Sequence, residues 1–264
     1  MTNIILSGCQ GRMGQVIAQL VKEKYNKDAV HNQESKICKI AFGVDPFGKS
    51  GDDFPVYASF DQIPADAPKG DVIIDFSHFS AVRSVVDYAV KTGTPAIIAT
   101  TGISQKDLAY INEQSSKVAL FRSANMSVGI CLVKDLIRRA AAFLGDDFDI
   151  EIVERHHNQK LDAPSGTALA LADAINQADA NKYSYIYDRH SRSAKRGHNE
   201  IGISAVRGGN IVGDHEVIFA GNNEVIEINH KAMSRSVFAD GAVRAAMFMK
   251  GKGPGMYNMD DLIG

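Results

Sequence analysis

The chain has 264 residues, of which 45% are hydrophobic and 23% charged, and its formal net charge is −2. These values are those of an ordinary soluble globular protein, and so small a charge gives no electrostatic case for binding nucleic acid or an anionic membrane. Apolar runs stay below the roughly 18 residues that span a bilayer, and residues 1–4 carry no basic cluster of a signal peptide. The three cysteines are scattered, which favours free thiols in a reducing cytoplasm.

A glycine-rich turn follows the first apolar run, residues 3–6. Gly8, Gly11 and Gly14 come next, and apolar residues at helical spacing follow them. This order predicts a strand, a turn and a helix, where glycines let the backbone approach a pyrophosphate and the helix N-terminus faces its charge. The spacing is G-x-x-G-x-x-G rather than the more common G-x-G-x-x-G, so a purely structural turn remains the alternative.

A carboxylate closes the second predicted strand, residues 39–44. Asp45, at the end of this strand, can accept hydrogen bonds from the ribose diol of adenosine. It lies further from the last glycine than the usual ~20 residues, an excess that the polar segment 25–36 can absorb. The alternative is that Asp45 simply opens the turn at residues 45–48. We weigh the two interpretations equally.

Strands and helices alternate through the first part of the chain. The predicted elements are strands at 71–76, 95–99 and 118–121, and helices at 80–91 and 104–116. Ser104 is placed to cap the second of these helices. The alternation predicts a Rossmann-like, doubly wound parallel sheet.

The pattern changes in the second half of the chain. It predicts helices at 130–144, 167–178 and 234–249, and strands at 148–153 and near 200–206, 211–219 and 224–230. The last three strands follow one another without helices between them, which implies a mixed or antiparallel sheet. We therefore expect an α/β chain with a second, smaller α+β domain.

The richest group of polar residues is 154–168, E-R-H-H-N-Q-K-L-D-A-P-S-G-T-A. It lies between a predicted strand and a predicted helix, where rigid elements commonly hold catalytic groups. Ser165 is placed as the N-cap of that helix, which would leave the N–H groups of Gly166 and Thr167 free for an anion such as a carboxylate. With the charge of Lys160 and an imidazole nearby, the loop suits a small acid that undergoes proton transfer.

Two adjacent histidines, His156 and His157, also suggest a metal site. Successive side chains on a strand point to opposite faces, so the pair would not chelate together, and no third ligand has zinc spacing. We therefore expect no metal. A structural histidine and a solvated Lys160 are the alternatives to catalytic roles.

Residues 154–168 meet every fixed position of the pattern E-x-H-H-x-x-K-x-D-A-P-S-G-T-A. In this the chain resembles the dihydrodipicolinate reductases, also called 4-hydroxy-tetrahydrodipicolinate reductases, of bacterial lysine (diaminopimelate) biosynthesis. The wording G-x-x-G-R-M-G at residues 8–14 resembles the same family, and the likeness extends along nearly the whole chain. The resemblance implies an oxidoreductase that reduces 4-hydroxy-tetrahydrodipicolinate to tetrahydrodipicolinate with NADH or NADPH and loss of water.

The resemblance also implies site residues. His156 and Lys160 match the family's catalytic pair, with His156 as proton donor or acceptor and Lys160 as proton donor and electrostatic partner. The dicarboxylate substrate would be bound by His157, Lys160, Ser165, Gly166 and Thr167. The cofactor would be bound by the glycine turn, the end of the second strand and two later loops, that is by Gly8, Cys9, Gln10, Gly11, Arg12, Met13, Asp45, Ala99, Thr100, Thr101, Ser123, Ala124, Asn125 and Met126.

The expected domains are a dinucleotide-binding domain at 1–126 and 235–264, and a substrate-binding and oligomerisation domain at 127–234. We expect a cytoplasmic homotetramer, because the few strands of the second domain cannot cover all their faces and edges within one chain. Both cofactors should be used, with NADH favoured, since Asp45 would repel a 2′-phosphate and Lys49 would offset that repulsion only in part.

Two rival hypotheses remain at this point. An NAD(P)-dependent dehydrogenase of another small acid or semialdehyde would share the nucleotide-binding half but lack the loop at 154–168. A non-enzymatic nucleotide-binding regulator would need the glycine turn but not a histidine and a lysine beside an open helix N-terminus.

Overall fold

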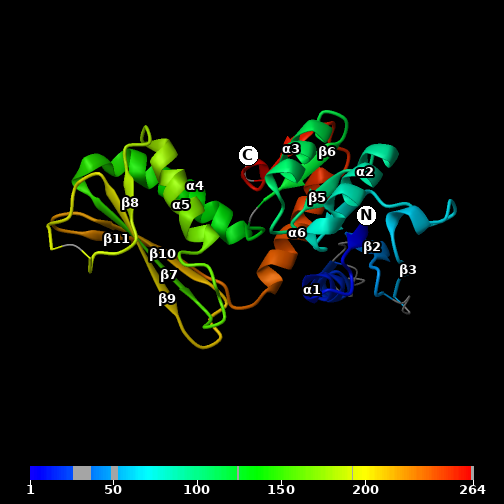
Figure 1. Cartoon of the computed structure of the whole chain (residues 1–264), viewed down its shortest axis with the longest axis horizontal. Helices are drawn as coiled ribbons and strands as arrows, with labels where there is room; N and C mark the ends of the chain where they lie inside the picture. The colour runs from blue at the N-terminus through cyan, green and yellow to red at the C-terminus, as the bar shows by residue number, and fades with distance from the viewer. Residues whose placement is uncertain (26–36, 49–52, 124, 192, 263–264) are drawn as a thin grey trace, which may run out of the picture. The chain divides into compact units, whose positions relative to one another are not determined.

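A computed structural model describes residues 1–25, 37–48, 53–123, 125–191 and 193–262. The chain divides into two compact units (Figure 1). Unit 1 consists of Met1–Ser127 and Arg235–Gly264, and unit 2 of Val128–Ser234. Lys49 and Ala124, for which the sequence predicts cofactor roles, lie outside the described residues, as does most of the polar segment 25–36.

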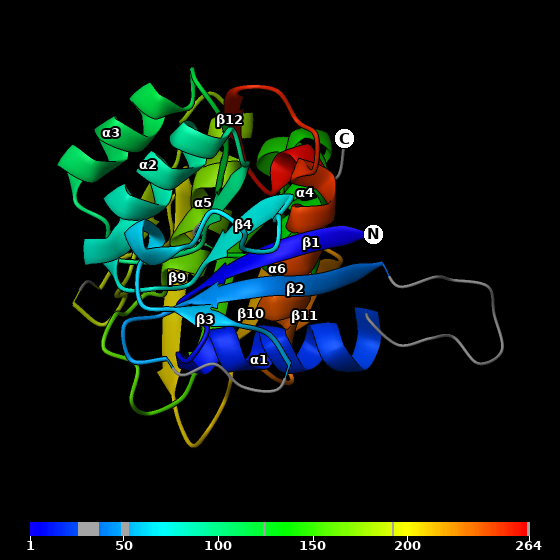
Figure 2. The ribbon, with the colours of Figure 1, turned by 90° about the vertical axis from the view of Figure 1, so that its right-hand side faces the viewer.

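Unit 1 is built on a seven-stranded sheet in which all neighbouring strands are parallel. Its order is β12-β6-β5-β4-β1-β2-β3, so the chain reverses its direction of travel between β1 and β4, as in dinucleotide-binding folds. Figure 2 shows β4, β1, β2 and β3 side by side. The strands are β1 (Thr2–Ser7), β2 (Cys38–Val44), β3 (Val56–Tyr57), β4 (Val72–Asp75), β5 (Ala96–Ile98), β6 (Ala119–Arg122) and β12 (Gly255–Tyr257). The predicted parallel, doubly wound sheet is confirmed.

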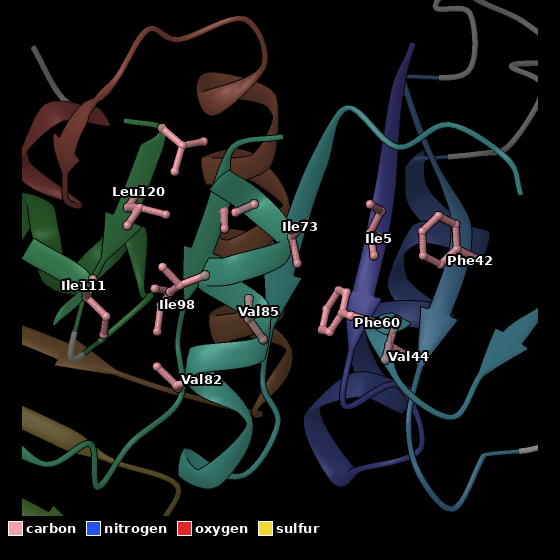
Figure 3. Close-up of a cluster of buried hydrophobic side chains, with 14 of the residues drawn as sticks. Ile5, Phe42, Val44, Phe60, Ile73, Val82, Val85, Ile98, Ile111 and Leu120 are labelled. Carbon is pink, nitrogen blue, oxygen red and sulfur yellow. The ribbon is translucent and has the colours of Figure 1, made fainter. Parts of the chain in front are cut away.

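Helices cover both faces of this sheet. Strand residues on one face pack with α2 (Val82–Thr92) and α3 (Gln105–Gln114) in a buried cluster that includes Ile5, Ile73 and Ile98 (Figure 3). On the other face α6 (Ser236–Met249) contacts β1, β4, β5 and β6, and α1 (Arg12–Leu20) packs against α6. Short helical turns complete the unit: η1 (Val21–Tyr25), η2 (Phe60–Gln62), η3 (Phe79–Ala81) and η5 (Asp260–Leu262).

Unit 2 is a five-stranded mixed sheet, which confirms the predicted second domain type. Its order is β11-β10-β7-β9-β8, with β10 antiparallel to β7 and β11, and with β9 parallel to β7 and β8. The elements are α4 (Val128–Leu144), η4 (Gly145–Asp147), β7 (Asp149–His156), α5 (Gly166–Ala178), β8 (Ser184–Ile186), β9 (Glu200–Arg207), β10 (Asp214–Ala220) and β11 (Val225–Lys231).

The two helices of unit 2 lie together along one face of its sheet (Figure 1). Along β7, buried residues alternate with half-buried ones, so Ile150 and Ile152 point to the helices, and Glu154 and His156 share that face. The face of β7 that packs against the helices is therefore apolar at first and carries two polar side chains, Glu154 and His156, at the C-terminal end of the strand.

Three strands were absent from the prediction: β3, β8 and β12. They have two or three residues each and lie at sheet edges, so they are too short to show any periodicity. Among the described residues, no helix combines the length and the apolar composition needed to cross a membrane.

Candidate active site

The glycine turn brings the end of β1 against the end of β4. Gly8 has a φ of 75°, and a Cβ on it would lie 2.9 Å from backbone atoms of Phe76 and Ser77. A Cβ on Gly14 would lie 2.2 Å from the carbonyl oxygen of Gly8, so α1 packs directly on the turn. Gly11 is the N-cap of α1 and has no side chain to bond the first N–H groups of the helix, the groups that bind phosphate in such folds.

Asp45 holds two turns together. Its Oδ2 accepts from the Gln10 N–H at 3.0 Å, and its Oδ1 accepts from the Phe47 N–H at 3.0 Å. The carbonyl oxygen of Asp45 accepts from Gly48 at 3.0 Å. Asp45 therefore does open the turn at 45–48, and it also ties this turn to the glycine turn; its contact with a ribose stays a prediction.

A cavity of about 860 Å³ opens beside the glycine turn, within unit 1. Its volume is in the range of small-molecule sites, and it lies where the strand order reverses. Eight residues predicted to bind the cofactor line it: Gly8, Gly11, Arg12, Met13, Asp45, Ala99, Thr100 and Thr101. Lining residues that the prediction missed include Phe47, Ser59, Phe76, Ser77, His78 and Ser80.

Other predicted cofactor residues lie elsewhere in the described part of unit 1. Cys9 is buried and Gln10 is exposed, and neither lines the cavity. Ser123, Asn125 and Met126 follow β6, and the Ser123 hydroxyl donates to the Asn125 carbonyl at 2.7 Å; none of the three lines the cavity.

A fully buried carboxyl group, Asp75, ends β4 close to the cavity. Its Oδ2 accepts from the Thr100 hydroxyl at 2.7 Å and its Oδ1 from the Ser77 N–H at 3.2 Å. The hydroxyl of Ser7 also bonds to it. Burial raises the pKa of Asp75, and these neutral donors offset the rise only in part. Sequence reasoning missed Asp75 because it lies within the predicted apolar strand 71–76.

In unit 2, His156 is the last residue of β7 and is 8% exposed. Its Nδ1 lies 2.6 Å from Oε2 of Glu154, which is completely buried. A Cβ on Gly213 would come within 3.0 Å of the other ring nitrogen, Nε2, so the absence of a side chain there leaves room at that atom. No other described side chain bonds Nε2, which makes it the nitrogen available to a ligand.

Glu154 has donors on both carboxylate oxygens. Arg207, the last residue of β9, donates to Oε2 and to Oε1, each at 2.7 Å, and the Ser165 N–H donates to Oε1 at 3.0 Å. Burial by itself would raise the pKa of Glu154, but the hydrogen bonds from Arg207, His156 and Ser165 outweigh it and hold that pKa below its ordinary value. Glu154 is therefore an ionised carboxylate in the interior.

Ser165 caps α5, as predicted: its Oγ accepts from the Ala168 N–H at 3.1 Å. The same hydroxyl lies 3.0 Å from Nε2 of His215, a buried residue that sequence reasoning did not select. Burial, and then the neighbouring His156, lower the pKa of His215 to about 4, so this ring is neutral at physiological pH. Its centroid lies 5.1 Å from that of His156, edge to face.

Lys160 has a partner within its own loop. Its Nζ lies 2.9 Å from Oδ1 of Asp162, and its N–H donates to the His157 carbonyl at 3.2 Å. The hydrogen bond from Lys160 lowers the pKa of Asp162, and the N–H of Gly166 acts on that carboxyl in the same direction. Lys160 and the N-terminus of α5, which the sequence predicts to bind a substrate carboxylate, thus contact the carboxylate of Asp162. The Asp162 side chain is 58% exposed.

Within the part of the chain that the structure describes, no three side chains of metal-binding type converge. Unit 1 offers a backbone turn beside a cavity, and unit 2 offers an imidazole, an ammonium group and a helix N-terminus.

The fold and these groups define a class: an oxidoreductase with a Rossmann-type dinucleotide domain and a second α+β unit. Residues 2–126 match the family described as dihydrodipicolinate reductase, N-terminus, and residues 129–263 match its C-terminus. The 4-hydroxy-tetrahydrodipicolinate reductases of Caldanaerobacter subterraneus subsp. tengcongensis and Clostridium tetani are 48% and 47% identical to this chain over 263 residues, which is 100% of this chain and 98% and 97% of theirs. The chain belongs to the dihydrodipicolinate reductase family, which confirms the resemblance stated from its motifs.

The fold has solved counterparts as well. The dipicolinate-bound dihydrodipicolinate reductase from Paenisporosarcina sp. TG-14 superposes with a TM-score of 0.77 at 22% identity, over 99% of both chains. An oxidoreductase from Agrobacterium radiobacter, in complex with NAD⁺, L-tartaric acid and magnesium, has a TM-score of 0.58 at 13% identity, over 99% of this chain and 92% of its own. At such identities the likeness is one of fold.

Proposed function

We propose that this protein reduces 4-hydroxy-tetrahydrodipicolinate to tetrahydrodipicolinate, with loss of water, in lysine biosynthesis. Relatives that carry the name of this activity align over the whole chain at 48% and 47% identity. The observation that carries the proposal is the loop 154–168, where an imidazole held by a buried carboxylate, a lysine and a capped helix N-terminus lie in one short segment. A dehydrogenase of another small acid would have no need of this combination.

Unit 1 suits a nicotinamide dinucleotide. Its cavity of about 860 Å³ lies beside a turn where Gly8 has no room for a side chain. We assign the dinucleotide to this unit, close to the predicted domain 1–126 and 235–264, and the substrate to unit 2, close to 127–234. Either NADH or NADPH, when bound, supplies the hydride. The residues that would hold it are those already named in the glycine turn, at Asp45 and in the loops at 99–101 and 123–126.

The substrate is a dicarboxylate, and unit 2 offers a place for an anion. Lys160 and the N–H of Gly166 would bind one carboxylate in the position that Asp162 occupies. His157 and Thr167 complete the proposed substrate contacts. Ser165 contributes by capping α5 through its hydroxyl, which keeps the remaining N–H groups of the first turn directed at the ligand.

The departing hydroxyl group needs one proton to leave as water. His156 is the proposed donor, through Nε2, because Nδ1 is occupied by Glu154. A positioned acid of this kind contributes roughly 10²–10⁴-fold to a rate. Lys160 serves as counter-charge to the substrate carboxylate and as a second proton source.

The proposed assembly is a cytoplasmic homotetramer. In the described part of unit 2, helices pack on one face of the sheet, and the edge strand β11 has Val225 57% exposed. A second copy would cover the other face and this edge. Light scattering at micromolar concentration should give four times the chain mass, and a monomer would contradict this part of the proposal.

The catalytic assignment is tested by NADH oxidation with and without the dicarboxylate, in wild type and alanine variants. His156→Ala and Lys160→Ala should lower kcat by about 10²–10⁴-fold, and Lys160→Ala should also raise KM. Asn158→Ala and Gln159→Ala, in the same loop, are the controls and should have small effects. NADH affinity, measured by titration, should stay near wild type in all four. Near-normal kcat in folded His156→Ala and Lys160→Ala would leave the loop with a structural role only.

A further inference from the structure

Glu154 and Arg207, which lie on neighbouring strands, form a two-point ion pair in the interior of unit 2. Both guanidinium NH groups donate to the carboxylate, one to each oxygen, at 2.7 Å. The Glu154 side chain has no exposed surface, and that of Arg207 is 20% exposed. Arg207 Nε is buried without a hydrogen-bond partner among the described residues, whereas both NH groups donate to Glu154 and to backbone carbonyl oxygens.

The pair fastens the loop at three points. Glu154 holds His156 at the start of the loop and the Ser165 N–H at its end. Arg207 donates to the carbonyl oxygen of Asp162, in the middle, at 2.6 Å. The segment that carries Lys160 is therefore fixed between three bonds to one ion pair.

The pair also decides which ring nitrogen of His156 can move a proton. An ionised carboxylate only accepts hydrogen bonds, so Nδ1 of His156 must carry its hydrogen, and any proton exchanged with a ligand is exchanged at Nε2. The neighbouring charges act consistently: Arg207 on β9 keeps Glu154 ionised, and His215 on β10 stays neutral above a pKa of about 4. Lys160 lies in the loop, and Gly213 leaves space at Nε2.

We infer that Glu154 and Arg207 are positioning residues for this reaction. Together they set the tautomer of His156 and fix the position of its ring relative to the N-terminus of α5, where a substrate carboxylate is proposed to bind. The inference rests on the proposed function. Neither residue needs to touch the substrate or the cofactor to act in this way. When a carboxylate orients a catalytic histidine, losing it lowers kcat because the histidine can take the wrong tautomer. In serine proteases this loss of kcat reaches about 10⁴-fold.

The test compares Glu154→Gln with a matched control on the same sheet. Arg155 and Glu216 form an ion pair at 2.6 Å between β7 and β10, on the face of β7 opposite Glu154 and His156, so Glu216→Gln removes a carboxylate but no bond to Glu154 or Arg207. Glu154→Gln should lower kcat by about 10²-fold, because the amide can donate to Nδ1 of His156 and so admit the wrong tautomer. NADH affinity should not change, and Glu216→Gln should behave as wild type.

A second readout does not depend on turnover. Nitrogen-15 NMR of the histidine rings in the full chain should find His156 of the wild type protonated at Nδ1 when neutral, and of mixed tautomer in Glu154→Gln. Arg207→Lys, which keeps the charge but not the two-point contact, should give an intermediate result. Wild-type kcat and a wild-type tautomer in a folded Glu154→Gln would overturn the inference, as would a wild-type His156 without the Nδ1 hydrogen. An inactive wild type would count against the proposed function instead, and the NMR result would still decide on the tautomer.

Discussion

Among the described residues, each unit buries one carboxyl group completely, and the pKa values of the two groups are shifted in opposite directions. Asp75 in unit 1 and Glu154 in unit 2 both lie at the carboxyl end of a strand with no exposed surface. Burial is the largest influence on both, yet the pKa of Asp75 is raised and that of Glu154 is lowered. The partners make the difference: hydroxyl and N–H groups surround Asp75, whereas a guanidinium and an imidazole surround Glu154. Depth of burial alone thus does not decide in which direction the pKa of an interior carboxyl group shifts.

The two groups have different surroundings. Asp75 accepts hydrogen bonds from Ser7, Ser77 and Thr100 beside the cavity. Glu154 accepts a hydrogen bond from His156, the proposed proton donor, and so fixes which of its ring nitrogens carries the hydrogen.

The largest expected effect comes from removing the cation. Arg207→Met leaves Glu154 ionised and buried without its strongest partner, which should cost about 3–5 kcal/mol of stability. Hydrogen exchange of the β7 and β9 amides in urea should report the loss in unit 2. The double variant Arg207→Met with Glu154→Gln should recover much of it, and an Arg207→Met protein as stable as wild type would remove the contrast between the two units.

His215, the neutral histidine beside His156, should make the stability of unit 2 sensitive to acid. The pKa of His215 falls from 6.5 to about 4 in the fold, so the unfolded chain binds a proton first as pH falls. Stability is therefore full above pH 6.5 and is lost progressively towards pH 4, by an amount on the order of 3 kcal/mol. Urea unfolding of wild type and His215→Gln at pH 7 and pH 5 checks this: the variant should show less pH dependence, and equal slopes would contradict it.

The two carboxyl groups should respond to pH with opposite signs. Because the pKa of Asp75 is raised above 3.8, wild type should lose stability relative to Asp75→Asn as pH rises from that value. Because the pKa of Glu154 is lowered below 4.5, wild type should lose stability relative to Glu154→Gln as pH falls through that value. Unfolding midpoints of the three proteins between pH 3 and pH 7 measure both slopes, and slopes of the same sign would refute the comparison.

The smallest expected effect is at Asp45, an interior carboxylate already bonded to two N–H groups. If it also meets the ribose and repels a 2′-phosphate, Asp45→Ala should narrow the gap between the kcat/KM values for NADH and NADPH by a few-fold. An unchanged ratio would leave Asp45 as a turn residue only.

Local patterns explain what could be predicted from the sequence. The glycine turn, the helix caps and the loop 154–168 are each encoded in adjacent residues. The structure has β1 and the glycine turn where the sequence predicts them, and Ser104 and Ser165 cap α3 and α5 as predicted. Arg207 is 53 residues from Glu154, and their pairing depends on the parallel register of β7 and β9, which no local pattern contains. Asp75 was hidden for a related reason, since its partners come from three separate segments of the chain.

The single-turnover rate of NADH oxidation, with NADH and substrate saturating, tests the central claim most directly. If Glu154 serves the proton and Asp75 serves the cofactor cavity, Glu154→Gln should slow this rate by about 10²-fold. Asp75→Asn should leave it near wild type, with its loss confined to a weaker Kd for NADH. A Glu154→Gln enzyme that turns over at the wild-type rate, or an equal slowing in both variants, would contradict the account.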